Sequence, residues 1–123
     1  MDRQITRRSG RIQISVTARE IGDDFLILVS GGREHIGSVV LAEPRQSLSG
    51  DGSVSCTSSV MNAIGHKDEM ICRYLAETSA AALSRRTVCT GGVHYDGITE
   101  AEIDGIRKAA CEIAAEIVRA FNQ

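Results

Sequence analysis

The last quarter of the chain carries the feature that most constrains the fold, an amphipathic helix with a defined start. Thr99 and Glu102 make the T-x-x-E pattern of a capping box, in which each side chain bonds the backbone N–H of the other residue. After them, apolar side chains recur every three or four residues, at Ile103, Ile106, Ala110, Ile113, Ile117 and Phe121. This spacing predicts a helix over 99–121 with one apolar face.

Most of the chain before this helix follows strand patterns. Apolar and polar residues alternate in 11–19, which predicts a strand with one buried face. The continuous apolar run 25–32 is typical of a central strand, and 35–43 predicts a third strand that Pro44 closes. Alternation in 53–60 predicts a fourth strand, one face of which is rich in hydroxyl groups.

A further helix and a fifth strand follow. Ile71, Leu75 and later small residues recur at helical spacing, which predicts a helix over 66–84. Residues 87–91 predict a short buried strand. The order is therefore β-β-β-β-α-β-α, and we expect an α/β (α+β) fold with a single mixed, largely antiparallel sheet of about five to six strands and two main helices.

Length and composition limit the functional classes. The 123 residues predict a single domain, 1–123, of which residues 1–9 form a loose N-terminal arm. No apolar run approaches the ~20 residues that a membrane span requires, and the basic N-terminus lacks the apolar stretch of a secretory signal. A net charge of −2 and 3% aromatic residues disfavour nucleic-acid binding. We therefore expect a cytoplasmic protein that binds neither membrane nor nucleic acid.

The four cysteines, Cys56, Cys72, Cys89 and Cys111, are widely spaced and form no C-x-x-C pair. A disulfide framework or a zinc ribbon spaces its cysteines differently. We interpret all four as small buried hydrophobic residues.

All three histidines stand behind glycines at junctions between predicted elements: His35 in GGREHIG, His66 in IGHKDE and His94 in GGVHYDG. The fourth and fifth strands enclose a helix, so they run parallel, and His66 and His94 follow their carboxyl ends. A hairpin between the third and fourth strands brings His35, at the start of the third, to the same rim of the sheet. We therefore expect the three histidines to converge.

This rim also collects charged residues and glycines, which together predict a ligand pocket. Open α/β sheets bind ligands beyond the carboxyl ends of their strands, and helix amino ends favour anions. An anionic or phosphorylated small molecule is therefore the leading ligand. Plainer explanations exist, because glycine pairs often only make turns, and Asp68 and Glu69 also complement a helix dipole.

Several chemistries stay open at such a rim. Three imidazoles and a carboxylate suit zinc or iron, but the helical H-x-x-x-H spacing is absent, so a metal is not favoured. His94 with Asp96, or His66 with Asp68, would make a proton-transfer pair. The alternatives are therefore a small histidine-dependent enzyme, metal-assisted or not, that acts on an anionic or phosphorylated small molecule, and a structural dimer whose polar rim is an assembly surface.

Three segments, in order, resemble a known family: REHIGSVVLAEPR, SVSCTSSVMNAIGHKDE and VCTGGVHYDGITEAEI. They are similar to the prenylated-flavin chaperone-like family, the small D-subunit proteins that accompany gallate and hydroxybenzoate decarboxylases. The likeness covers the chain from about residue 10 onward and rests on the motifs H-[IV]-G, G-H-K-[DE] and G-[IVG]-H-x-D. It implies a homodimer with a fold similar to that of proteasome-assembly chaperones.

The resemblance also implies a function and a site. Such a protein binds reduced prenylated flavin mononucleotide (FMN), assists its loading into a partner decarboxylase and performs no turnover of its own. The residues expected to bind this cofactor are His35, His66, Lys67, Asp68, His94, Asp96, Gly91, Gly92 and Ser58. Tyr95 is the one aromatic residue placed to stack on a flavin ring.

Overall fold

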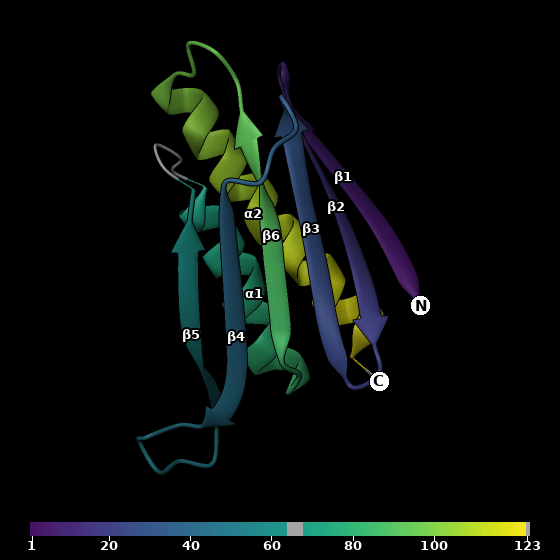
Figure 1. Ribbon diagram of the computed structural model, residues 1–123, viewed down its shortest axis with the longest axis vertical. Helices are drawn as coiled ribbons and strands as arrows, with labels where there is room; N and C mark the ends of the chain where they lie inside the picture. Colours follow the sequence, from purple (N-terminus) through teal and green to yellow (C-terminus); the bar gives the residue numbers. More distant parts are fainter. Residues whose placement is uncertain (64–67, 123) are drawn as a thin grey trace.

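The computed structural model describes residues 1–63 and 68–122, which form a six-stranded mixed sheet and two helices. The elements are β1 (Asp2–Ser9), β2 (Ile12–Ile21), β3 (Asp24–Gly32), β4 (Ser38–Gln46), β5 (Val54–Asn62), α1 (Glu69–Leu83), β6 (Thr87–His94) and α2 (Glu100–Phe121). The order of strands across the sheet is β1-β2-β3-β6-β4-β5 (Figure 1). β3 and β6 pair in parallel, whereas the other four neighbouring pairs are antiparallel. The predicted fold class is confirmed.

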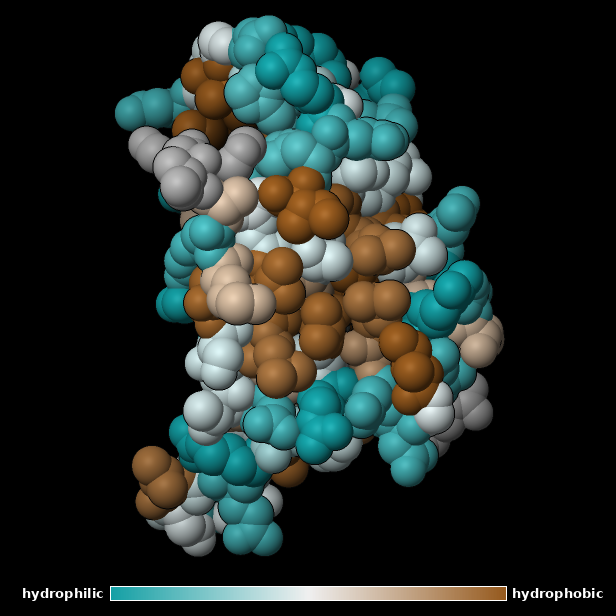
Figure 2. Space-filling view, in the orientation of Figure 1, coloured by the Kyte–Doolittle hydropathy of each residue, from teal (hydrophilic) through white to brown (hydrophobic). Residues whose placement is uncertain are grey.

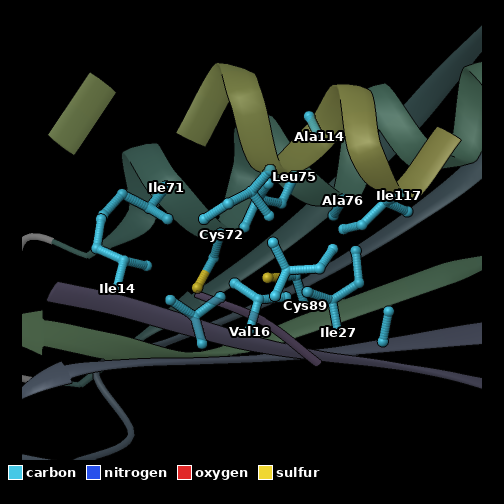
Figure 3. Close-up of a cluster of buried hydrophobic side chains, with 14 of the residues drawn as sticks. Ile14, Val16, Ile27, Ile71, Cys72, Leu75, Ala76, Cys89, Ala114 and Ile117 are labelled. Atoms are coloured by element: carbon cyan, nitrogen blue, oxygen red, sulfur yellow. The ribbon is translucent and has the colours of Figure 1, made fainter. Parts of the chain in front are cut away.

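Both helices lie on one face of the sheet, and the core fills the space between them and the strands (Figures 1 and 3). The alternation predicted for 11–19 is confirmed, since β2 buries every second side chain, at Ile12, Ile14, Val16 and Ala18. Phe25 of β3 meets Phe121 at the end of α2 edge-to-face, with ring centroids 4.7 Å apart. Burial of each such large side chain contributes about 1.5–3 kcal/mol to folding.

The start of α2 carries the predicted capping box. The Thr99 hydroxyl accepts from the Glu102 N–H at 3.1 Å, and the Thr99 N–H donates to the Glu102 carboxylate at 3.0 Å. Arg11 binds the same carboxylate and, with the Thr99 N–H, lowers the pKa of Glu102 to about 2. The capping box therefore already places the Glu102 carboxylate at the amino end of α2, where negative charge is favoured.

Residues 1–9 correct the expectation of a loose arm, because residues 2–9 form the edge strand β1. This strand pairs with β2 from Asp2↔Arg19 to Ser9↔Ile12. Its side chains Arg3 and Arg7 reach over to Glu116 on α2. An edge strand with one solvent-exposed face needs few apolar residues. The polar composition of this segment therefore gave no alternation from which a strand could be predicted.

Several boundaries also differ from the predictions, and β6 extends to His94 rather than ending at residue 91. β4 begins at Ser38 and continues through Pro44 to Gln46 rather than closing at Pro44. The pairing of β4 with β6 ends at Ala42, so Pro44 lies where β4 has a single neighbour, and a missing N–H is tolerated there. α1 begins at Glu69, and the preceding residues of the predicted helix 66–84 include His66 and Lys67, which lie outside the described residues.

Burial differs among the four cysteines, and the interpretation of all four as buried residues is wrong for Cys111. Cys72 and Cys89 are fully buried, as predicted, and Cys56 is half-buried. Cys111 is exposed, because it lies beside the apolar stripe of α2 rather than on it. All four are free thiols.

The face of the sheet turned away from the helices, here called the open face, is covered by no helix of the described chain (Figure 1). Strand register places two mainly apolar rows across it, here called the apolar rows, one of Leu28, Thr90, Val39 and Met61 and one of Leu26, Val88 and Leu41. Leu28 is 45% exposed and Met61 is 70% exposed. Figure 2 shows hydrophobic residues gathered over the middle of this face.

Neither helix is long and apolar enough to cross a membrane among the residues that the structure describes.

Candidate functional site

The rim of the sheet where β6 ends and β4 begins brings His35 and His94 together. β4 runs antiparallel to β6, and the Gly37 N–H donates to the Gly91 carbonyl at 2.9 Å. His35 precedes β4 and His94 ends β6, and their imidazole centroids lie 6.3 Å apart with the rings nearly perpendicular at 87°. The predicted meeting of these two histidines is therefore confirmed, whereas His66 lies outside the described residues.

His35 is held between two hydrogen-bond acceptors. Its Nδ1 lies 3.0 Å from the Arg33 carbonyl oxygen, and its Nε2 lies 2.9 Å from Asp68 Oδ2. A carbonyl oxygen and an ionised carboxylate accept but do not donate, so both ring nitrogens must carry hydrogen. These bonds, first to the Arg33 carbonyl and then to Asp68, raise the pKa of His35 above its ordinary value. These contacts therefore favour the imidazolium form of His35, paired with the Asp68 side chain.

Asp68 connects three segments at this rim. It precedes α1 in the N-cap position, but its side chain makes no cap hydrogen bond to that helix. Instead Oδ2 binds His35, and Oδ1 accepts the backbone N–H of Val93 in β6 at 2.8 Å. Asp68 is buried, with 7% of its surface exposed. The plainer expectation, that Asp68 only complements the dipole of α1, therefore does not describe its main contacts.

Two glycines make room for the His35–Asp68 pair. A Cβ on Gly92 would lie 2.5 Å from His35 Nε2 and 2.8 Å from Asp68 Oδ2, and a Cβ on Gly37 would also run into Asp68. Gly91 instead allows β6 to pair closely with β3. Its φ is +130°, and a Cβ there would run into the backbone of Val29. The glycines of this rim thus leave space for other groups of the protein itself. The sequence pattern alone does not distinguish this role from leaving space for a ligand.

His94 and Asp96 form a second, more open pair. His94 Nε2 lies 3.0 Å from Asp96 Oδ1, and the Arg33 guanidinium lies 3.9 Å from the other carboxylate oxygen. The bond from His94, followed by the charge of Arg33, lowers the pKa of Asp96. The Asp96 side chain is 84% exposed, so this pair borders solvent.

A hollow of about 410 Å³, here called the apolar hollow, lies between β6, α1 and the first turns of α2. Its wall is aliphatic, made by Met70, Ile71, Val93, Ile98, Ile103 and Ile106. Its polar lining is His35, Asp68, His94 and Tyr95. The two histidines thus face a space that is apolar on its remaining sides, which is the usual composition of a small-molecule site.

A second hollow, of about 360 Å³, lies across Tyr95 and is here called the arginine hollow. It is lined by Arg8, Arg11, Gln13, Ser15, Ser30, Glu34 and Tyr95, with Gly31 and Gly32. The Tyr95 hydroxyl donates to the Gln13 carbonyl at 3.0 Å and accepts the Gln13 N–H at 2.8 Å. Tyr95 therefore ties the segment after β6 to β2 and borders both hollows.

Ser58 is not brought to this rim. It lies in β5 opposite Ala42, on the side that faces α1, where its hydroxyl donates to Glu77. Lys67 lies outside the described residues, as His66 does. The described part of the chain contains no group of three or more histidine, cysteine, aspartate or glutamate residues placed to hold a metal ion.

A comparison with protein-family models finds a match over residues 8–122 to the family described as prenylated flavin chaperone LpdD-like domain. The chain belongs to this family. The match spans nearly the whole chain, including the rim and both hollows. The family that the three sequence segments indicate is therefore confirmed, and with it a place among prenylated flavin chaperones.

A solved structure similar to this family member comes from a yeast complex titled "Crystal Structure of a Novel Chaperone Complex for Yeast 20S Proteasome Assembly". The likeness has a TM-score of 0.58, at 11% sequence identity, and covers 97% of this chain and 96% of the other. At this identity the likeness concerns the fold alone, and it confirms the fold similarity that the resemblance implies. No curated protein resembles the chain at a significant level.

Several residues of this chaperone-family site escaped the sequence reasoning. Ile103 and Ile106 belong to the apolar stripe of α2 that predicts core packing, yet they also line the apolar hollow. Arg8 belongs to the segment 1–9 that was expected to be a loose arm, and Arg11 belongs to the predicted strand 11–19. Periodicity marks a residue as facing inward, but whether it meets core or cavity depends on how the neighbouring elements diverge.

Proposed function

We propose that the protein binds reduced prenylated FMN in the apolar hollow and assists its loading into a partner decarboxylase, with no turnover of its own. The observation that carries the proposal is the composition of this hollow in a member of a prenylated flavin chaperone family. An aliphatic wall faces a polar end made by two histidines and an aspartate. A prenylated flavin has the same division, since it joins an added aliphatic group to a ring system rich in hydrogen-bonding atoms.

The two histidines would meet the flavin differently. Both nitrogens of His35 bind protein acceptors, so His35 contributes positive charge and shape rather than a hydrogen bond to the ligand. His94 uses Nε2 on Asp96, and its Nδ1 has no partner among the described residues. We therefore assign the hydrogen bond to the ring atoms of the flavin to His94, and we retain Asp68, Gly92 and Asp96 as supporting residues.

Binding under anaerobic conditions tests the proposal. Purified protein titrated with reduced prenylated FMN should bind it, and the loaded protein should activate an apo-decarboxylase faster than free cofactor does. Ile103→Asn places an amide in the aliphatic wall and should weaken binding by about tenfold. Val118→Asn is the matched control, because Val118 is also half-buried on α2 but lies near its far end. Absence of binding by the wild-type protein would remove the proposal.

A second candidate, a small histidine-dependent enzyme, is favoured by the His94–Asp96 hydrogen bond beside the apolar hollow. In this reading His94 transfers a proton to or from an anionic small molecule. Turnover by the isolated protein that His94→Ala abolishes would support the enzyme, whereas binding and transfer of reduced prenylated FMN without turnover would support the chaperone.

We further propose that the protein is a homodimer that joins two copies through their open faces. The apolar rows of this face lie on β3, β6, β4 and β5, whereas Arg8, Gln13 and Ser15 of the arginine hollow lie toward the β1–β2 edge. The apolar rows and the exposed Leu28, Ile36 and Met61 make this face costly to leave in water.

We also propose a cytoplasmic location, because the free thiols fit a reducing compartment.

A further inference from the structure

We infer that the arginine hollow binds the phosphate group of the cofactor, with Arg8 as the principal cation. This inference rests on the proposed function, because it places the anionic end of the same ligand. In it, the ring system occupies the apolar hollow and the phosphate occupies the hollow on the other side of Tyr95.

The wall between the two hollows is thin. Tyr95 lines both of them. At Gly31, which lines the arginine hollow, a Cβ would lie 2.8 Å from the Gln13 carbonyl oxygen and 3.0 Å from Val93 Cγ1. Val93 in turn lines the apolar hollow. Tyr95 thus stands at the rim between the two hollows, and a molecule with an apolar and an anionic end would contact both by passing over the rim at Tyr95.

The charges of the arginine hollow favour an anion at Arg8. Arg11 is already neutralised, since it binds both carboxylate oxygens of Glu102. Arg8 forms no ion pair with any described residue, and its guanidinium donates only to the side-chain amide oxygen of Gln13. Glu34 is the one carboxylate that lines this hollow, and it opposes an anion there. Arg8 thus provides an uncompensated positive charge with further N–H donors.

The remaining lining suits phosphate oxygens. Ser15 and Ser30 present hydroxyl groups beside Arg8, and the two glycines leave the backbone uncovered. A guanidinium combined with hydroxyl donors is a common way to recognise phosphate. The described lining residues of the apolar hollow include no arginine or lysine, so among them no guanidinium or ammonium group meets the phosphate.

The test compares reduced prenylated FMN with its dephosphorylated form, reduced prenylated riboflavin, in anaerobic titrations. Wild-type protein should bind the phosphorylated form at least about tenfold more tightly, as expected for a charge-assisted hydrogen bond. Arg8→Gln should remove most of this preference and leave the affinity for the dephosphorylated form unchanged. Glu34→Gln should act in the opposite direction and increase the preference for phosphate.

Arg45→Gln is the matched control. Arg45 is likewise exposed and without an ion pair to any described residue, but it lies at the far end of β4, where it binds Thr57. Equal affinity of wild-type protein for the two ligands, or equal effects of Arg8→Gln and Arg45→Gln, would overturn the inference while leaving the proposed function intact. Failure of wild-type protein to bind either ligand would instead overturn the proposed function, and the inference with it.

Discussion

At the scale of single residues, the His35–Asp68 pair forms part of the polar lining of the apolar hollow. Paired charges that are largely shielded from water are retained only when their hydrogen-bonding capacity is satisfied. Here both nitrogens of His35 and both oxygens of Asp68 have partners, contributed by three separate segments of the chain. The pair therefore fixes the relative positions of the residues before β4, the start of α1 and the end of β6.

This arrangement predicts a stability contribution that depends on pH. Because the pKa of His35 is raised in the folded protein, the contribution is fully present below the ordinary value of about 6.5 and is lost as pH rises through the folded pKa. A neutral ring would turn a lone pair toward the Arg33 carbonyl or the Asp68 carboxylate. His35→Gln should therefore cost about 1–3 kcal/mol near pH 6 and less near pH 9, as measured by urea unfolding. A cost that grows with pH would contradict the assignment of His35 as an imidazolium.

The close contact of Gly92 with the His35–Asp68 pair gives a second prediction. Gly92→Ala should displace His35 and Asp68, at an overpacking cost of about 1–3 kcal/mol in the free energy of unfolding. It should also shift the titration of His35, as followed by proton NMR. Gly50→Ala is the control, because a Cβ there meets no atom within 4 Å and only the φ of +74° is strained. A His35 titration unchanged in Gly92→Ala would show that the pair does not depend on this glycine.

At the scale of elements, β1 shows how an edge strand holds to the rest of the molecule. Ile5 is its single buried apolar side chain, with 2% exposed. Arg7 binds Glu116 at 2.6 Å across to α2, and Arg3 reaches the same carboxylate at 3.2 Å. β1 therefore closes one end of the core by joining β2 to α2, and its last residues bring Arg8 to the arginine hollow.

Substitution of Ile5 distinguishes this strand from a loose arm. Ile5→Ala should lower the free energy of unfolding by about 2–4 kcal/mol, because it leaves a cavity under α2. Gln4→Ala, on the neighbouring exposed position, should change it by less than about 0.5 kcal/mol. If both variants unfold at the same denaturant concentration as wild type, β1 makes no contribution to the core.

At the scale of the whole molecule, the helices cover only one face of the sheet, and the other face exposes apolar rows. Burial of that face by a second copy would turn the molecule into two helix layers outside two packed sheets. His35 and Ile36 also line a shallow hollow on the open face beside the rim. Pairing of the open faces would therefore reach the histidine segment and is expected to influence cofactor binding.

Oligomeric state provides the measurement. Met61→Glu places a charge in an apolar row and should raise the dimer dissociation constant by at least about tenfold, as measured by analytical ultracentrifugation. Leu48→Glu is the control, since Leu48 is 90% exposed in the connection between β4 and β5, away from the rows. A wild-type protein that stays monomeric at high concentration, or equal effects of both variants, would rule out this interface.

The sequence determined the elements of this protein and much of their order. Side-chain periodicity depends on whether a segment is a helix or a strand, so 11–19, 99–121 and the cap at Thr99 were predictable from local pattern. Chain connectivity also predicted that His35 and His94 share a rim, because parallel crossovers and hairpins allow few arrangements. Polar edge strands lack such a signal, which is why β1 was missed.

The roles of the rim residues depend on tertiary packing. Three of these roles depend on distances between segments that are remote in sequence. His35 pairs with Asp68, Gly92 leaves room for that pair, and Ser58 binds Glu77 away from the rim. The two hollows also depend on the distances between segments, because a cavity is the space that several elements leave unfilled. Residue identity records which groups are present, whereas charge state and cavity shape follow from the packing of the whole chain.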